Sequence, residues 1–390
     1  MKIAYIFDQV LPSIVTESMQ PMNTLSGLSN IGCDCTLFVP APNNEEVPTA
    51  ESVRKYYNVA GQFKIDFIHS IYPGPRMPQK VIHPMICATL MKKYLSSFDF
   101  VYSRNIPAII SAITAGVPAL YDSYRPWPEQ YHSALTPLFR LLFKSRYFLG
   151  ITSHSDYVRQ CFIDAGFDPD RIRTARNGYE KTHYEPVLSK QEAREKLGLP
   201  MDARIACYSG RFDMKKGLEH LLFLAKSRPD VTFIFIGGGY TLDEVTEFEI
   251  EASKLSNCIL TGWKKYNEIP VYHYASDVLM IPPSTSPLKK VGHTVLPMKL
   301  YSYFASGRAI YAPIAPDTAE LLHHNKNAWL VIPDNQEEEL KGFSELIDNP
   351  ELIERLGQAV ADEAPNYTWE ARGKTIVDFA QERLKTIHKI

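Results

Sequence analysis

Short apolar segments recur along the chain, each followed by a polar or proline-containing turn and a stretch suited to a helix. In the first half these segments are KIAYIF, CTLFVP, FDFVYS, PALYDS and FLGITS. Such alternation is typical of a parallel sheet covered by helices. The rhythm restarts after residue 186 with ARIACYSG, VTFIFIGGG, NCILTG, DVLMIPPS, RAIYAP and AWLVIP. The sequence therefore predicts two α/β units of similar plan.

The segment THYEPVLSKQEAREKLGLP lies between the two units and has no strand pattern. Its helical part ends at Gly198 and Pro200, residues that commonly stop a helix. We therefore predict an N-terminal domain over residues 1–187 and a second domain over 188–367. A closing helix over 368–390 could pack on either unit, and the N-terminal domain is one candidate.

Composition describes an ordinary folded protein and argues against a general nucleic-acid binder, because the net charge is −2 and not basic. The charge is unevenly distributed, however. Residues 54–185 contain 17 Lys and Arg against 10 Asp and Glu, a surplus of +7. The positive charge of this region suits an anionic lipid or a phosphate-bearing partner, although a chance imbalance of solvated charges is an equal alternative.

The six cysteines show no metal-ligand spacing, and no run of about 18 apolar residues suggests a membrane span. Because the N-terminus also reads as a strand and not as a signal peptide, we expect a cytoplasmic protein. The stretch LTPLFRLLFKSRYFLG, residues 135–150, mixes apolar and basic residues. It is either a helix that lies on the inner face of a membrane or a buried helix with a basic rim.

The stretch YSGRFDMKKG, residues 208–217, crowds cations and glycines into one bend after a predicted strand. A diphosphate bound there would meet fixed cations, each contributing roughly 1.5–3 kcal/mol per charge-assisted hydrogen bond. The spacing is not that of a Walker loop. A surface loop with solvated lysines is the competing interpretation.

Two later segments repeat this design of a strand followed by a special turn. In VTFIFIGGGY the glycines Gly237 and Gly238 allow the backbone to approach a ligand closely, although a simple tight turn would use them too. In residues 284–310, Pro297 suits the first turn of a helix that ends at Gly307. Amides before this proline would point at an anion with the positive end of the helix dipole.

At this point the chain resembles a known family, the retaining GT-B glycosyltransferases of family four (glycosyl transferases group 1). The segments that carry the resemblance are GRFDMKKG, LTGWKKYNEIPVYHYASDVLMIPPS and HTVLPMKLYSYFASGRAI, and it extends over most of the chain. The resemblance implies two Rossmann-like α/β/α domains that face each other across a cleft. It also implies transfer of a sugar from a nucleotide-diphosphate sugar to an acceptor on the N-terminal domain.

The resemblance implies that Arg211 and Lys216 are the catalytic groups, since they would hold the donor diphosphate. It implies no obligatory metal and no cofactor beyond the donor. The expected donor-binding residues, from the motifs and the resemblance together, are Gly210, Gly237, Gly238, Trp263, Lys264, Thr294, Val295, Leu296, Lys299 and Ser302.

The sequence also departs from the family pattern. The family often carries two glutamates eight positions apart where this chain has Thr294 and Ser302. A neutral hydroxyl lacks the charge assistance of a carboxylate, a difference of about 1 kcal/mol. Where a first-domain histidine is frequent, the segment YDSYRPWPEQYH offers candidates for acceptor binding, namely Asp122, Tyr124, Trp127 and His132. The aromatic members could stack on sugar rings or pack against neighbouring helices.

The sequence thus predicts a retaining glycosyltransferase that acts in the synthesis of a surface polysaccharide, glycolipid or glycoprotein glycan. Its partners would be a nucleotide sugar and a glycan or lipid-linked acceptor. Two alternatives remain open. One is a binding or scaffold protein that has lost turnover, suggested by Thr294 and Ser302. The other is a nucleotide-sugar epimerase of the same architecture.

Overall fold

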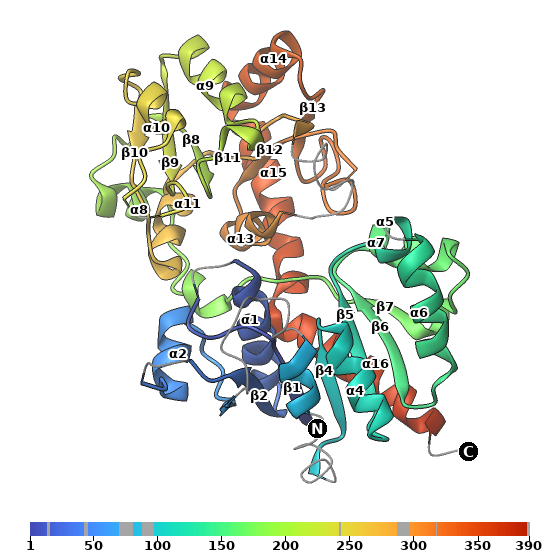
Figure 1. Ribbon diagram of the computed structural model, residues 1–390. Coiled ribbons are helices and arrows are strands. Elements are labelled where there is room, and N and C mark those ends of the chain that lie inside the picture. Colours follow the sequence, from blue (N-terminus) through green and yellow to red (C-terminus); the bar gives the residue numbers. More distant parts are fainter. Residues whose placement is uncertain are drawn as a thin grey trace. The chain divides into compact units, whose positions relative to one another are not determined.

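A computed structural model of the chain describes residues 1–13, 16–42, 46–69, 81–87, 97–130, 132–241, 243–286, 297–316 and 318–387 (Figure 1). The chain divides into two compact units, which we consider separately. The first unit comprises Met1–Glu180 together with Thr368–Ile390, and the second comprises Lys181–Tyr367.

The first unit contains a parallel sheet with the strand order β3-β2-β1-β4-β5-β6-β7. Its strands are β1 (Lys2–Ile6), β2 (Asp34–Pro40), β3 (Lys64–Ile68), β4 (Phe100–Ser103), β5 (Ala119–Ser123), β6 (Phe148–Ser153) and β7 (Ile172–Thr174). Alternate residues of β1 enter different cores: Ile3 and Tyr5 join one apolar cluster, whereas Ala4 and Ile6 join another. Both faces of the sheet are therefore buried, which explains the continuous apolar character of its strands.

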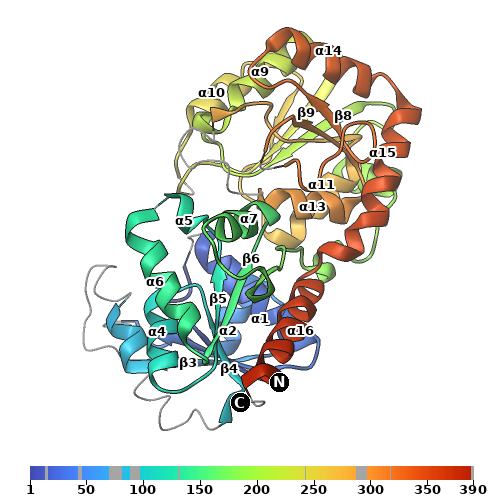
Figure 2. The ribbon, with the colours of Figure 1, turned by 90° about the vertical axis from the view of Figure 1, so that its right-hand side faces the viewer.

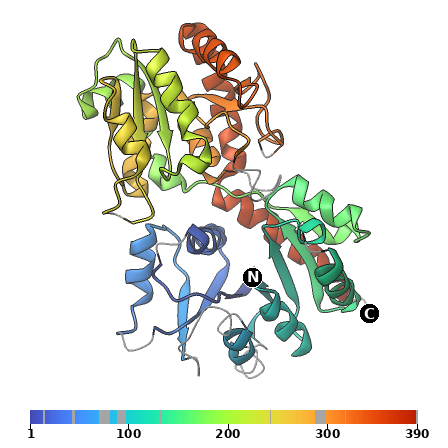
Figure 3. The same ribbon diagram turned by 45° about the horizontal axis from the view of Figure 1, so that its top comes forward.

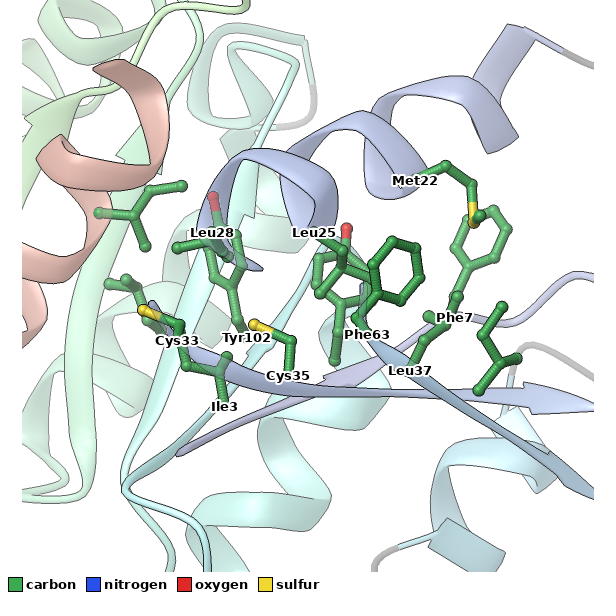
Figure 4. Packing of buried hydrophobic residues seen from close by; sticks show 14 of the residues in the cluster. Ile3, Phe7, Met22, Leu25, Leu28, Cys33, Cys35, Leu37, Phe63 and Tyr102 are labelled. Carbon is green, nitrogen blue, oxygen red and sulfur yellow. The ribbon is translucent and has the colours of Figure 1, made fainter. Parts of the chain in front are cut away.

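Helices cover both faces of this sheet. They are α1 (Thr16–Asn30), α2 (Ala50–Tyr57), α4 (Ile106–Thr114), α5 (Trp127–Gln130), α6 (His132–Lys144), α7 (Asp156–Asp164) and the closing α16 (Trp369–Ile387), with a 3-10 turn η2 (Pro169–Arg171). On one face, Met22, Leu25 and Leu28 of α1 lie over strand residues such as Ile3 and Leu37 (Figure 4).

Helix α6 carries the basic and apolar stretch that allowed two interpretations. Its Phe139 and Leu142 are buried in the core of the first unit, with Phe143 packed against them. Leu141 is 65% exposed. The described part of the helix therefore faces the core with most of its apolar side chains and leaves a basic rim outside. No described helix combines the length and apolar character needed to cross a bilayer.

The second unit contains a parallel sheet with the order β10-β9-β8-β11-β12-β13. Its strands are β8 (Arg204–Ser209), β9 (Val231–Ile236), β10 (Cys258–Leu260), β11 (Val278–Met280), β12 (Ala309–Pro313) and β13 (Trp329–Val331). Its helices are α8 (Lys190–Leu197), α9 (Leu218–Ser227), α10 (Glu247–Ala252), α11 (Ile269–Ala275), α13 (Met298–Ser306), α14 (Gln336–Ile347) and α15 (Pro350–Glu363). Short 3-10 turns are η3 (Lys181–Tyr184), η4 (Met214–Lys216), η5 (Tyr266–Glu268) and η6 (Ala364–Tyr367).

Every apolar segment that predicted a strand forms one, and the sequence analysis missed β3 and β7. Strand β3 alternates in exposure, and β7 (Ile172–Thr174) contains a single apolar residue, so neither gives a continuous apolar run. The second unit also begins before residue 188. Tyr184 belongs to it because its backbone oxygen accepts a hydrogen bond from the Tyr274 hydroxyl at 2.8 Å.

The closing helix α16 returns to the first unit and packs along α1, as Figures 2 and 3 show. A charged pair that is almost wholly buried fixes it there. The Arg372 guanidinium donates to the Asp122 carboxylate at 2.8 Å, to the Tyr102 hydroxyl at 3.1 Å and to Thr24 at 3.2 Å. Burial opposes ionisation of Asp122, yet Arg372 and Arg104 lower the pKa of this carboxyl below its usual value.

Arg372→Met should therefore destabilise the first unit by about 3–5 kcal/mol, since it leaves the Asp122 carboxylate buried without its main partner. The matched control is Arg173→Met, which removes an exposed pair between β7 and Glu382 of α16 and should cost about 1 kcal/mol or less. Urea unfolding at pH 7 measures both. Because the pKa of Asp122 is lowered in the fold, its contribution is complete at this pH and is lost as the pH falls through the folded-state pKa. Equal losses for the two variants would contradict this role for Arg372.

Candidate functional site

The strand order of the second sheet reverses between β8 and β11. The chain runs outward from β8 to β9 and β10, and then continues on the other side with β11, β12 and β13. In open parallel sheets, ligands bind beyond the carboxyl ends of the strands at such a reversal. Here those ends are Ser209 and Met280. The segment YSGRFDMKKG emerges at this point.

The bend after β8 has a defined local structure. The Asp213 side chain accepts a hydrogen bond from the Lys215 amide at 3.0 Å and so caps the turn η4. Gly217 follows in the left-handed region with a φ of 79°, and α9 starts directly after it. This conformation leaves Lys215 exposed, whereas Arg211 and Lys216 are half-buried.

Lys299 of α13 joins these residues from another part of the chain. Its Nζ atom lies 3.6 Å from the ring centroid of Tyr208, at the end of β8. The Arg211 guanidinium lies 4.2 Å from the ring centroid of Tyr240. Aromatic faces attract cations in this geometry. We call Arg211, Lys216 and Lys299 the cation cluster.

The members of the cation cluster perturb one another. Burial, and then the charge of Arg211, lower the pKa of Lys216. Burial, and then the charge of Lys216, lower the pKa of Lys299 well below its usual value. Among the residues that the structure describes, no carboxylate forms an ion pair with any of the three. An anion bound at this point would relieve both the repulsion and the desolvation.

Arg211 also has an unused donor. Its Nε atom is buried and has no hydrogen-bond partner among the described residues. A buried donor left unpaired costs about 1–3 kcal/mol. A phosphate oxygen would supply the missing acceptor.

Two glycines bring the backbone close to the cation cluster. Gly210 has a φ of 145°, and a Cβ atom there would lie 2.8 Å from the Nζ of Lys299. Gly237, at the end of β9, has a φ of 142°, and its Cβ would lie 1.9 Å from the backbone oxygen of Gly210. Both conformations are ones that L-residues rarely adopt. The glycines are thus required for the shape of the site itself.

The expected base-binding residues lie beside these glycines. Trp263 is 45% exposed, and its indole edge lies where a Cβ atom of Gly238 would be placed. Lys264 follows it and is half-buried. An exposed indole at this position offers a flat surface for a nucleotide base. Ser302 is half-buried on α13, one turn after Lys299. Thr294, Val295 and Leu296 lie outside the described residues.

Several residues of the site escaped the sequence analysis. Buried His273 of α11 lies 3.1 Å from the Ser209 hydroxyl, and burial together with Lys299 lowers its pKa to about 3. A neutral imidazole therefore supports the end of β8 without adding charge. Tyr208 and Tyr240 were also missed, because nothing in an apolar strand or a glycine turn marks an aromatic ring as a cation partner.

The candidate acceptor residues of the first unit lie at the end of β5 and in the segment that follows it, and β5 is separated by β4 from the reversal of the sheet between β1 and β4. The Asp122 carboxylate forms an ion pair with Arg372, so in this structure it stabilises the fold. Tyr124 lies between two guanidiniums, with Arg104 at 4.2 Å and Arg125 at 5.3 Å from its ring centroid.

The two remaining acceptor candidates are Trp127 and His132. The Trp127 indole donates to the Tyr121 hydroxyl at 2.6 Å. Its ring centroid lies 5.6 Å from the Arg125 guanidinium. The His132 side chain lies outside the described part of the structure.

Comparison with known proteins shows to which family the second unit is similar. Residues 189–362 match the family described as Glycosyl transferases group 1. This part of the chain is a glycosyl transferases group 1 domain. Over these residues the glycosyl transferases group 1 family inferred from the sequence motifs is confirmed, and the match contains all of the cation cluster.

The chain is similar to curated relatives over only part of their length. The chain is 26% identical over 175 residues to TuaH of Bacillus subtilis, a glycosyltransferase assigned provisionally to teichuronic acid biosynthesis. It is 24% identical over 212 residues to the Escherichia coli UDP-Gal:alpha-D-GlcNAc-diphosphoundecaprenol alpha-1,3-galactosyltransferase. The matches cover 44% and 50% of this chain and 42% and 53% of the relatives. The chain thus spans about half the length of the relatives it matches.

Solved structures resemble the chain over nearly its full length. HepE of Anabaena in complex with UDP has a TM-score of 0.73 and 17% identity, and covers 98% of this chain and 100% of its own. UDP-GlcNAc 2-epimerase of Neisseria meningitidis bound to UDP-GlcNAc has a TM-score of 0.62 and 13% identity, over 98% and 100% of the two chains. The fold is therefore the GT-B architecture of two Rossmann-like domains. Because the epimerase shares it, the fold alone does not decide the reaction.

The geometry of the glycosyltransferase domain makes Gly237 a sensitive position. Gly237→Ala should lower the free energy of unfolding by about 2–5 kcal/mol, since left-handed strain of about 1–2 kcal/mol adds to a backbone displacement of about 1–3 kcal/mol. The matched control is Gly198→Ala. Gly198 also has a positive φ, of 65°, but its Cβ would meet nothing within 4 Å. Denaturant midpoints should separate the two variants, and equal midpoints would show that the close approach to Gly210 is not tight.

Proposed function

We propose that the protein is a retaining glycosyltransferase that takes its sugar from a nucleoside-diphosphate sugar. The observation that carries this proposal is the cation cluster at the sheet reversal of a glycosyl transferases group 1 domain, whose three members form no ion pair with a carboxylate in the described parts of the chain. Its shape and charge suit a diphosphate. Trp263 beside Gly238 suits the attached base.

The reaction breaks the bond between the anomeric carbon and the diphosphate, so negative charge develops on the leaving group. Cations that are already in place stabilise this charge without reorganisation, and such preorganised electrostatics contribute several kcal/mol. Arg211 and Lys216 would bind the diphosphate in both the ground state and the transition state. Because their charges already offset the leaving group, we propose that no metal ion is required.

Lys299 adds a proton-linked element to this mechanism. Its lowered pKa means that the amine gives up its proton more readily in the empty site than in water. A diphosphate beside it would raise that pKa again by direct attraction. A bound diphosphate would therefore favour the charged form of Lys299 at the point where the leaving group needs stabilisation.

We further propose that the acceptor carries an anionic group that binds at the first unit. Arg125 lies beside Tyr124 and Trp127 and, among the described residues, forms no ion pair. Arg104 faces Asp122, but that carboxylate is already paired more closely with Arg372. The names of two relatives, which refer to teichuronic acid and to a diphosphoundecaprenol acceptor, support an acidic or phosphate-bearing acceptor. Such an acceptor would place the enzyme in the synthesis of a surface polysaccharide or glycolipid, in the cytoplasm at the inner membrane face.

Binding of UDP, GDP, ADP and CDP tests the donor site. Arg211→Ala and Lys216→Ala should each lower the affinity for the nucleotide by about 10- to 100-fold, as expected for loss of a charge-assisted hydrogen bond. The control is Lys215→Ala in the same bend, whose exposed side chain should matter by less than about fivefold. Isothermal titration calorimetry gives the affinities. If none of the three substitutions changes the nucleotide affinity, the donor binds at another place.

Product analysis with the matching nucleotide sugar separates the three activities. Release of nucleoside diphosphate supports the transferase, and a transferred sugar with unchanged anomeric configuration supports retention. Conversion of the donor sugar to its epimer without an acceptor would instead show an epimerase. Tight binding without any turnover would show a binding protein, the outcome that Thr294 and Ser302 made an alternative.

The acceptor site is tested by comparing glucuronate and glucose 6-phosphate with neutral glucose in saturation-transfer NMR. The anionic sugars should bind about tenfold more tightly than glucose, and Arg125→Gln should remove this preference because it removes one charged contact. Arg146→Gln is the matched control, since Arg146 also lies against a tyrosine of the first unit but at the start of β6. If Arg125→Gln retains the preference for anions, the acceptor binds at another place.

A further inference from the structure

His220 is a titratable group that the proposed chemistry does not use. It lies in the first turn of α9, three residues after the bend that carries Lys216, and its side chain is 12% exposed. A cation in the first turn of a helix is disfavoured by the helix dipole. Carboxylates on two other segments oppose this effect.

Both ring nitrogens of His220 face a carboxylate. Nδ1 lies 2.9 Å from the Glu339 carboxylate of α14, and Nε2 lies 3.5 Å from the Asp334 carboxylate. Glu219 of the same helix adds a third negative charge at 3.9 Å. A neutral imidazole donates from one nitrogen only and would present a lone pair to the other carboxylate. The geometry therefore fits an imidazolium that donates to both.

Asp334 connects this histidine to a second segment. Its carboxylate accepts from the Ser284 hydroxyl at 2.9 Å and from the Thr285 amide at 3.2 Å, and also from the Thr285 hydroxyl. Its own amide donates to the Pro283 carbonyl at 3.0 Å. Asp334 holds this position with a φ of 57°, a left-handed conformation that Asp and Asn tolerate better than most residues.

The segment held by Asp334 touches the cationic bend. A Cβ atom on Gly217 would lie 2.2 Å from the Cβ of Ser284, so the Ser284 side chain packs directly against the backbone of Gly217. Ser284 follows β11 at the reversal of the sheet, and Gly217 directly follows Lys216. A contact chain thus leads from Glu339 through His220 and Asp334 to Ser284, and from there to the end of the bend.

We propose that His220, as an imidazolium, is a positioning residue that fastens the segment 284–286 to the cationic bend, so that diphosphate binding weakens as the pH rises and this link is lost. The binding part of this inference rests on the proposed function. The hydrogen bond to Glu339 raises the pKa of His220 against the opposing effect of burial, and the nearby carboxylates raise it further. The link is therefore complete below the ordinary pKa of histidine and is lost as the pH rises through the raised value.

The first measurement needs no ligand. Hydrogen exchange at the Thr285 and Ser286 amides should show protection at pH 6.5 that falls toward pH 8.5 after correction for the intrinsic exchange rate. Both amides donate to groups of the linked segment, namely Asp334 and Ser284. His220→Gln should lower the protection at pH 6.5 and remove its dependence on pH. His323→Gln, which changes an exposed histidine of the same unit, should leave the wild-type profile intact.

The second measurement titrates UDP into the full-length protein from pH 6.5 to 8.5. His220→Gln should bind UDP about three- to tenfold more weakly than the wild type at pH 6.5. The ratio of the two dissociation constants should fall toward one as the pH rises through the raised pKa of His220. The ratio of the two affinities removes the pH dependence that comes from ionisation of UDP and of the cation cluster, since this contribution is common to both proteins.

Asp334→Asn distinguishes the link from a simple charge effect. Asparagine also tolerates the left-handed backbone, so the variant should fold. Removing a negative charge near an anion site would by itself strengthen UDP binding, whereas loss of the link should weaken it about three- to tenfold at pH 6.5.

The inference is overturned if hydrogen exchange and UDP affinity depend on pH in the same way in the wild type and in His220→Gln. It is also overturned if Asp334→Asn binds UDP more strongly than the wild type. If no nucleoside diphosphate binds the wild type while the exchange profiles differ as described, the proposed function fails and the His220 link is supported.

Discussion

Three cations share one corner of the second unit, and among the described residues none of them forms an ion pair with a carboxylate, although Asp213 lies close enough to oppose the loss of the Lys216 proton. Arg211 and Lys216 come from the bend after β8, whereas Lys299 comes from α13. Their mutual repulsion and desolvation disfavour this arrangement in the empty protein, as the lowered pKa values of the two lysines show. The surrounding fold must hold them together. Close glycine contacts, the aromatic faces of Tyr208 and Tyr240, and the neutral His273 do so without neutralising the charge that a ligand needs.

The two units treat buried charge in opposite ways. In the first unit Arg372 and Asp122 satisfy each other within the protein, and this pair fixes the closing helix α16 to the sheet. In the second unit the cation cluster remains uncompensated. A compensated pair serves the fold, because it has no affinity left for a ligand, whereas an uncompensated cluster gains stability only when an anion binds. This contrast explains why Asp122, a candidate for acceptor binding by sequence position, is occupied by a structural partner.

The His220 network gives a further reason why the segments around the cation cluster keep their places. The bend, the segment after β11 and α14 are distant in sequence, and none of them forms a strand at the point where they meet. A histidine between two carboxylates can join them where no backbone ladder is available. The same physical rule applies as in the pair of Arg372 and Asp122: a buried charge fixes structure when its partners belong to the protein.

The sequence by itself determined the two-unit α/β plan, the strands with continuous apolar runs and the cationic bend at Arg211 and Lys216. These features are local, since they depend on periodicity, on glycine and on charge within a few residues. Only the tertiary structure brought Lys299 onto Tyr208, assigned Asp122 to Arg372 and placed His220 between Glu339 and Asp334. Those partners are separated by 91, 250 and more than 110 residues, so no local pattern links them. Short or edge strands such as β7 and β3 were missed for the related reason that pairing with a neighbouring strand, and not their own composition, makes them strands.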